Sequence, residues 1–186
     1  MSPGRGSPRH ELHGGSGETP SPSSNERPRQ VAVIGSGSCG EGSEAWRLAE
    51  EVGRLLAEAG ARVVCGGRTG VMEAVARGAA GAGGTVIGIV PGPSVEEANE
   101  HCTHVVATSL GQARNLAVVS SGDVAIAIGG EWGTLSEIAF ARRLGRPVVA
   151  LRSWELDGRG AMQGAPGVTP ADSAEEAVAA ALKALP

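Results

Sequence analysis

The residue of this sequence best placed to do chemistry is Glu137. It ends the segment 129–137, which reads GGEWGTLSE and follows the wholly apolar run 124–128. A buried strand, a glycine-rich turn and a helix N-terminus in this order form an anion site, because free backbone N–H groups and the helix dipole favour negative charge. Glu137 would lie beside the bound anion, where it could act on the ligand.

Glu137 also has a purely structural interpretation. Thr134 and Glu137 match the Thr-x-x-Glu capping box, with Thr134 as the N-cap and Glu137 as the third helical residue. Both interpretations stay open, and as a cap Glu137 should contribute about 0.5–2 kcal/mol of stability. From the residues alone, Arg114 is an exposed surface arginine, and Trp132 either stacks on a base or covers the end of the sheet.

Three glycine-rich turns each follow a predicted strand directly, at residues 35–37, 66–67 and 129–130. In a parallel sheet every such turn lies at the carboxyl edge, where open α/β sheets bind their ligands. Glycine also serves simply to allow a positive φ, but three turns on one edge are more than packing requires. We therefore predict a phosphate or nucleotide pocket along this edge.

The first of these turns, residues 35–40, reads GSGSCG and matches the dinucleotide fingerprint G-x-G-x-x-G. That fingerprint expects an acidic residue after the second strand to bind the ribose hydroxyls. Residues 65–68 read CGGR instead, which disfavours NAD. Arg68 could accept a 2′-phosphate, so an NADP-binding oxidoreductase remains a distant alternative.

A single lysine, Lys183, excludes two further classes of site. A P-loop needs a lysine after its glycines, and a pyridoxal phosphate enzyme needs one for its Schiff base. Residues 101–104 read HCTH and resemble a zinc pattern, but His101 and Cys102 would face opposite sides of a strand. We predict no metal site.

The elements that must position this edge alternate along the chain. Apolar runs predict strands at residues 31–34, 62–65, 85–90, 103–107, 123–128 and 147–151. Apolar residues at helical spacing predict helices at residues 43–59, 71–82, 110–120, from the 129–137 segment to 144, and from 173 to about 185. This order predicts an α/β fold: a Rossmann-like, doubly wound parallel sheet of about six or seven strands with helices on both faces.

The domain is expected to span residues 30–186, after a disordered tail at residues 1–29 that is rich in Ser, Pro, Gly and Arg. The loop 91–102 should form a short helix or a mobile lid, and residues 152–167 a glycine-rich loop. The net charge of −4 gives no general attraction to nucleic acid. Three cysteines without CxxC spacing argue against a disulfide framework and favour a reducing cytoplasm. We expect neither a membrane span nor a signal peptide.

Two motifs are similar to those of the Lonely Guy (LOG) family. Residues 66–72, GGRTGVM, resemble its GGxxGxM segment, and residues 130–137, GEWGTLSE, resemble its PGGxGTxxE segment. The likeness covers residues 30–186 in order and spacing. The GGExGT form, the GRPV run at residues 145–148 and the short length resemble the bacterial branch related to molybdenum cofactor carrier proteins.

LOG proteins are cytokinin riboside 5′-monophosphate phosphoribohydrolases, long misnamed lysine decarboxylases. The resemblance implies cleavage of a nucleoside 5′-monophosphate to free base and ribose 5-phosphate, with Arg114 and Glu137 as catalytic residues. Arg114 matches the arginine of the family's MHxRK segment, whose Met and His are absent here and whose Lys is replaced by Asn115. The family's proline is also missing, and Glu131 replaces its second glycine. The alternative is a non-catalytic carrier of a phosphorylated ligand such as molybdenum cofactor.

The turns and the resemblance together indicate the binding residues and partners. The ligand would be a nucleoside monophosphate or a similar phosphorylated small molecule, with no cofactor required. Nucleic acid and membranes are not expected as partners, and a homodimer or higher homo-oligomer is expected through helices beside the motif. The predicted phosphate- or nucleotide-binding residues are Gly35, Ser36, Gly37, Gly66, Gly67, Arg68, Gly70, Gly129, Gly130, Glu131, Gly133 and Thr134.

Overall fold

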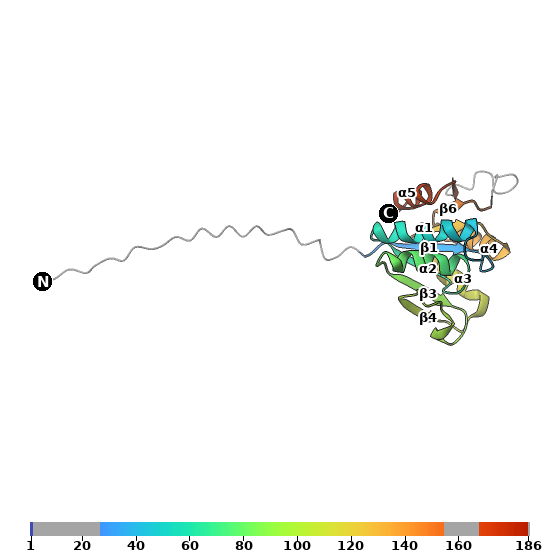
Figure 1. The fold of residues 1–186 in the computed structure, drawn as a ribbon, viewed down its shortest axis with the longest axis horizontal. Coiled ribbons are helices and arrows are strands. Elements are labelled where there is room, and N and C mark those ends of the chain that lie inside the picture. The colour runs from blue at the N-terminus through green and yellow to red at the C-terminus, as the bar shows by residue number, and fades with distance from the viewer. Residues whose placement is uncertain (2–26, 155–167, 186) are drawn as a thin grey trace.

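One parallel sheet organises the chain, and its strands follow the order β4-β3-β2-β1-β5-β6-β7. The computed structural model describes Met1 and residues 27–154 and 168–185 (Figure 1). The strands are β1 (Gln30–Gly35), β2 (Arg62–Cys65), β3 (Val86–Val90), β4 (His104–Ala107), β5 (Val124–Ile128), β6 (Val148–Leu151) and β7 (Val168–Ala171).

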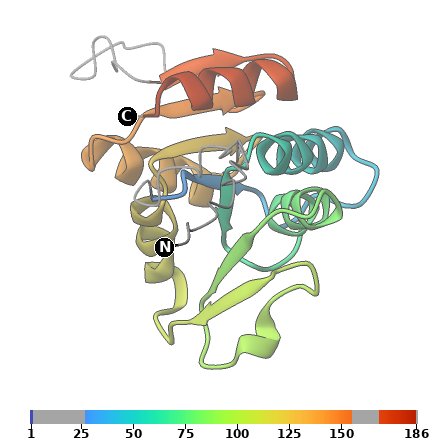
Figure 2. The same cartoon turned by 90° about the vertical axis from the view of Figure 1, so that its left-hand side faces the viewer.

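Helices cover both faces of this sheet. They are α1 (Glu44–Glu58), α2 (Val71–Gly81), α3 (Arg114–Ser121), α4 (Trp132–Arg143) and α5 (Ala174–Lys183), with short 3₁₀ turns η1 (Val95–Glu97) and η2 (Gly111–Ala113). Figure 2 shows α1, α2 and α5 on one side of the strands and α3 and α4 on the other. The predicted doubly wound α/β fold is therefore confirmed.

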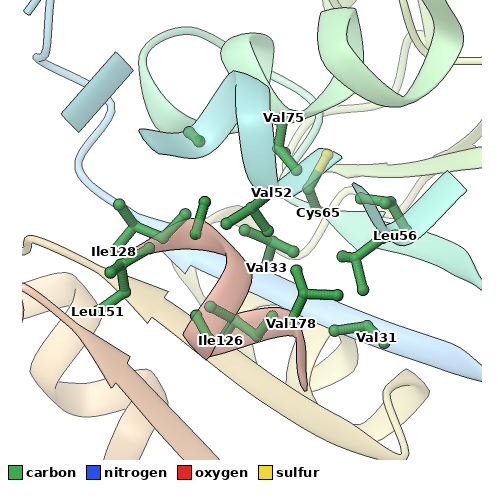
Figure 3. Close-up of a cluster of buried hydrophobic side chains, with 14 of the residues drawn as sticks. Val31, Val33, Val52, Leu56, Cys65, Val75, Ile126, Ile128, Leu151 and Val178 are labelled. Carbon is green, nitrogen blue, oxygen red and sulfur yellow. The ribbon is translucent and has the colours of Figure 1, made fainter. Parts of the chain in front are cut away.

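The larger core lies between the sheet and the layer of α1, α2 and α5. Figure 3 shows Val33 and Ile126 of the central strands packed with Val52 of α1, Val75 of α2 and Val178 of α5. Every residue of β5 is buried, because the strand has a helix layer on each face. This explains the uninterrupted apolar run before the 129–137 segment.

Some boundaries differ from those expected. Strand β7 was not expected: it is a short edge strand whose two exposed residues are Thr169 and Pro170, and an edge position tolerates a proline. The helix expected at 110–120 consists of η2 followed by α3. Residues 2–26 of the predicted tail and residues 155–167 of the predicted loop lie outside the described residues. Arg27 forms an ion pair with Asp123, so the segment before β1 already contacts the domain.

The topology reverses between β1 and β5. From β1 the chain winds outward through β2, β3 and β4, and then returns to place β5 on the other side of β1. Ligands of open α/β sheets bind at such a switch point, outside the carboxyl ends of the strands. Across the described ranges, every helix is too short or too polar to span a lipid bilayer.

Candidate functional site

A cavity of about 270 Å³ lies at this switch point, where the turns after β1 and β2 meet the N-terminal ends of α3 and α4. Its volume is near the lower end of the roughly 300–1,000 Å³ typical of ligand pockets. Both predicted catalytic residues line it, together with most of the predicted binding residues. The lining residues predicted from the sequence are Gly35, Ser36, Gly37, Gly66, Arg68, Arg114, Glu131, Gly133, Thr134 and Glu137.

Four predicted binding residues do not line this cavity: Gly67, Gly70, Gly129 and Gly130. All four have positive φ angles, which side chains of L-residues disfavour, so they shape the turns that carry the lining residues. Gly129 and Gly130 face a separate shallow cavity beside Trp154.

The cavity also contains residues that the sequence analysis did not assign to it. Thr69 and Met72 belong to the 66–72 motif, and Gln112 and Asn115 lie within two residues of Arg114. Their closeness in sequence to predicted site residues could have identified them. Val33 and Ile34 at the end of β1 complete the lining. The Thr69 hydroxyl donates to the Gly37 carbonyl at 2.9 Å and thereby joins the first two turns.

The capping box predicted for Thr134 and Glu137 is wrong. Helix α4 begins three residues earlier, at Trp132, so that Glu131 is its N-cap and Thr134 is the third helical residue. The positive φ angles of Gly129 and Gly130 complete the turn before Glu131, and the chain can enter the helix at once. Glu137 lies beyond the first turn, where a side chain cannot reach back to the N-cap.

The N-terminus of α4 is open towards the cavity. The Glu131 side chain makes no capping hydrogen bond, and Gly133 and Thr134 line the cavity. The first N–H groups of a helix lack partners within the helix. Because no described side chain caps α4, these donors and the positive end of the helix dipole are available to an anion.

The Glu131 carboxylate is instead bound to the first turn. Its Oε1 accepts hydrogen bonds from the hydroxyls of Ser36 at 2.9 Å and Ser38 at 2.6 Å. The hydrogen bonds from Ser38 and Ser36 lower the pKa of Glu131, so it remains ionised at neutral pH. Through these hydrogen bonds the ionised Glu131 side chain links the first and third turns at the rim of the cavity.

Arg114 and Glu137 face each other inside the cavity, although the residues alone indicated a surface arginine. They are 7% and 6% exposed, and Arg114 Nη1 lies 3.9 Å from Glu137 Oε1. Burial raises the pKa of Glu137 to about 7, against the opposing attraction of Arg114. Burial also lowers the pKa of Arg114. Such perturbed, buried groups in a cavity are typical of functional sites.

The local structure explains how the arginine enters the cavity. Gly66 has no side chain at the position where the Arg114 guanidinium lies, and a Cβ there would overlap it. Arg114 Nη2 also lies 3.8 Å from Met72 Sδ. The glycine after β2 thus makes room for a residue 48 positions later in the chain, counting from Gly66 to Arg114.

Two buried polar atoms beside this pair have no hydrogen-bond partner among the described residues. They are Arg114 Nε, a donor, and Asn115 Oδ1, an acceptor. Leaving such groups unpaired costs free energy, which a polar ligand in the cavity would recover. The arrangement can therefore hold a group that both accepts and donates hydrogen bonds.

Trp132 and the HCTH segment at residues 101–104, two further candidates from the sequence, do not line this cavity. The Trp132 side chain is 77% exposed, and its ring lies 5.4 Å from that of Trp154. The HCTH segment contributes to no cluster of three or more potential metal ligands within residues 27–154 and 168–185.

Comparison with known proteins supports the resemblance inferred from the motifs. The sequence profile of the SLOG cluster4 family matches residues 28–178. A protein of Archaeoglobus fulgidus is 44% identical over 123 residues, which is 66% of this chain and 80% of that protein. A cytokinin riboside 5′-monophosphate phosphoribohydrolase of Rhodococcoides fascians is 35% identical over 116 residues, which is 59% of this chain and 58% of that enzyme.

A solved structure is also similar to this chain. The molybdenum cofactor binding protein from Rippkaea orientalis superposes with a TM-score of 0.76 at 32% sequence identity, over 84% of this chain and 97% of that one. This chain is thus similar in sequence to a hydrolase and in structure to a cofactor-binding protein.

Proposed function

We propose that this chain, which belongs to the SLOG cluster4 family, is a nucleoside 5′-monophosphate phosphoribohydrolase. The observation that carries the proposal is the buried Arg114–Glu137 pair. Both residues line the cavity, and Arg114 Nη1 lies 3.9 Å from Glu137 Oε1. Burying two ionisable groups without close contact costs stability, and such pairs are typical of functional sites.

The open N-terminus of α4 supports a phosphate site beside that pair. The backbone N–H groups around Gly133 and Thr134 would bind the 5′-phosphate, with Ser36 and Arg68 on the neighbouring turns. A phosphate held there orients the ribose towards Arg114 and Glu137, which lowers the entropic part of the barrier. The phosphate thus supplies positioning, while the buried pair supplies the chemistry.

The proposed reaction is hydrolysis of the N-glycosidic bond. The bond between C1′ and the base nitrogen breaks, water adds its hydroxyl to C1′, and the base nitrogen gains a proton. Glu137 as a carboxylate would bind the ribose hydroxyls and stabilise the positive charge of an oxocarbenium-like transition state. Arg114 and the unpaired Asn115 Oδ1 would orient the ribosyl unit from the opposite side. This chemistry requires water and no cofactor.

A carrier without turnover is the second candidate, and Glu131 favours it. The hydrolase motif has glycine where this chain has Glu131, whose carboxylate occupies the rim of the proposed phosphate site. The cofactor-binding protein from Rippkaea orientalis supports the same alternative. In this case the turns and α4 would hold a phosphorylated ligand, and Glu137 would contact it without cleaving it.

We also propose a cytoplasmic homo-oligomer that associates through α3 and α4. Leu116 of α3, Phe140 of α4 and Leu144, the C-cap residue of α4, are exposed apolar residues. Light scattering during gel filtration tests the assembly. A monomer at the concentrations used for turnover assays would contradict it.

The hydrolase proposal is tested by incubating the full chain with AMP, GMP, CMP and UMP and separating the products by chromatography. We expect free base and ribose 5-phosphate in equal amounts from at least one of the four. Calorimetric titration with the same nucleotides runs in parallel. Binding without base release overturns the hydrolase and leaves the carrier. Binding of NADPH that is lost in Arg68→Ala would instead favour an oxidoreductase.

A further inference from the structure

The two thiols of Cys65 and Cys102 lie together behind the second glycine turn. Cys65 ends β2 and pairs in register with Gly88 of β3. The Cys65 side chain therefore points to the same face of the sheet as a side chain at position 88 would. Gly88 has no side chain, and the Cys102 sulfur lies 2.7 Å from the position its Cβ would take. The Cys102 thiol therefore occupies the side-chain space next to Cys65.

We propose that Cys65 and Cys102 are a modification site at which a two-electron oxidant, such as a peroxide, forms an intramolecular disulfide. Cys65 and Gly88 lie on neighbouring strands about 4.8 Å apart. Both Sγ (2.7 Å) and Cβ (3.3 Å) of Cys102 lie beside the position of a Gly88 Cβ, and the Cys65 and Cys102 thiols interact directly. All three cysteines of the described chain are free thiols in this structure. The pair is compatible with a reducing compartment, where disulfides are transient and redox-sensing.

The two cysteines have different roles in this reaction. Interaction with the Cys65 thiol lowers the pKa of Cys102, which is only partly buried. Interaction with the Cys102 thiol, together with complete burial, raises the pKa of Cys65. Cys102 therefore meets the oxidant first, because its sulfur is the more accessible of the two and its thiolate, the nucleophilic form, is the easier to generate.

The chemistry balances without a further reactant. The Cys102 thiolate attacks one peroxide oxygen and the O–O bond breaks, which gives a sulfenic acid and, after protonation, water. The Cys65 sulfur then attacks the Cys102 sulfur. The S–O bond breaks, and the departing hydroxyl leaves as a second water with the Cys65 proton. Two thiols are oxidised by two electrons, and the peroxide is reduced.

A second consequence rests on the proposed function, because the loop that carries Cys102 is bound to the second turn. Asn99 donates from its backbone N to the Gly67 carbonyl and from Nδ2 to the Arg68 carbonyl, each at 2.8 Å. Cys102 in turn donates its backbone N–H to the Asn99 carbonyl at 3.2 Å. Forming an S–S bond of about 2.05 Å draws the sulfurs together. Cys65 is held between β1 and β3, so the loop and Arg68 move, and phosphate affinity should fall several-fold.

The experiment oxidises the full chain with hydrogen peroxide and maps cross-linked peptides by mass spectrometry. We expect loss of two hydrogen atoms, a Cys65–Cys102 cross-link within one chain, and reversal by dithiothreitol. Cys39→Ser is the control and should form the same cross-link. Cys102→Ser should form none, with a thermal melt to verify that it is folded. Accumulation of Cys102 sulfinic acid beside a reduced Cys65, or cross-links through Cys39, would overturn the proposal.

Calorimetric titration of the reduced and oxidised chain with AMP tests the coupling to the pocket. A several-fold weaker affinity after oxidation, restored by dithiothreitol, is expected. Equal affinities overturn the coupling. Peptide mapping does not depend on any ligand, so a failure of the proposed nucleotide site, seen as no binding by the reduced chain, is distinguishable from a failure of the thiol pair.

Discussion

The helices α1 and α4 both follow strands that flank the switch point, but their N-termini differ. In α1 the Ser43 hydroxyl accepts a hydrogen bond from the Trp46 N–H, so the chain itself satisfies a helix donor. In α4 the N-cap residue is Glu131, which makes no such bond and binds the serines of the first turn. The two ends share a location at the sheet edge, and only α4 leaves its donors to a ligand.

The buried faces of the two helices differ in the same way. Helix α1 buries Trp46, Ala49, Val52, Gly53 and Leu56, a set without a charged side chain. Helix α4 buries Thr134 and Glu137 beside Ile138 and Ala141. The comparison indicates that α1 mainly stabilises the fold, whereas α4 buries polar groups beside the cavity, which costs stability. The following predictions sharpen or break this contrast.

The largest effect is expected from Glu137→Gln. If Glu137 stabilises a developing positive charge, kcat/KM for base release should fall by about 100- to 1,000-fold, as for other electrostatic stabilisers. Nucleotide binding measured by calorimetry should persist. Glu175→Gln, an exposed acid near the start of α5, is the matched control and should leave both quantities unchanged. Full turnover in Glu137→Gln would reduce α4 to a binding helix.

The pH dependence of stability should distinguish the two helices next. With the pKa of Glu137 raised from its usual value of 4.5 to about 7, the folded state keeps a proton that the unfolded chain has lost in this range. The free energy of unfolding should therefore fall as pH rises from about 4.5 to 7, by on the order of 1–3 kcal/mol. Urea titrations of the wild type and of Glu137→Gln check this.

In Glu137→Gln this part of the pH dependence should vanish, and the variant should be more stable than the wild type at pH 8. That is the opposite of the loss expected for a helix cap. In the wild type, kcat/KM should rise with pH through about 7, since the carboxylate is the active form. A destabilised Glu137→Gln at pH 8 would contradict the assignment of burial as the cause.

A smaller effect is expected when the α1 cap is removed. Ser43→Ala should lower the free energy of unfolding by about 1 kcal/mol, because the Trp46 N–H loses its acceptor. Nucleotide affinity should not change, because Ser43 does not line the cavity. Thermal melts and calorimetry give the two quantities. A matching loss of affinity would mean that α1 also serves the ligand.

The smallest effect is expected at the rim of the cavity. Glu131→Gln removes a negative charge beside the proposed phosphate site, so affinity for AMP should rise by roughly 2- to 10-fold at low salt, and less at high salt. Stability should change little, since Glu131 does not cap α4. Glu44→Gln at the start of α1 is the matched control. A weaker affinity in Glu131→Gln would instead identify Glu131 as a ligand-binding residue.

Much of the fold was predictable because its determinants are local. Apolar runs such as 124–128 located the inner strands, and the N-cap Ser173 located the start of α5. The edge strand β7 was missed because an edge strand does not need an apolar face on both sides. The start of α4 was placed too late because a matching capping box is only a pattern, and the glycine dihedral angles that open the helix are not visible in it.

The sequence by itself determined the edge of the sheet along which the predicted binding residues gather. Glycines after β1, β2 and β5 must meet there once the strands are parallel, and the parallel order follows from the alternation of strands and helices. The family resemblance also indicated two catalytic candidates: Glu137 through the motif at 130–137, and Arg114 through the segment at 112–115.

Only the tertiary structure decided what those residues experience. The burial that raises the pKa of Glu137, the space that Gly66 leaves for Arg114, and the contact between Cys65 and Cys102 all join residues distant in the chain. Desolvation and close approach depend on every element packed around a group. Local periodicity does not depend on them. The residues alone therefore indicated a surface arginine where the fold has the buried Arg114–Glu137 pair, and they did not indicate that Cys65 and Cys102 lie together.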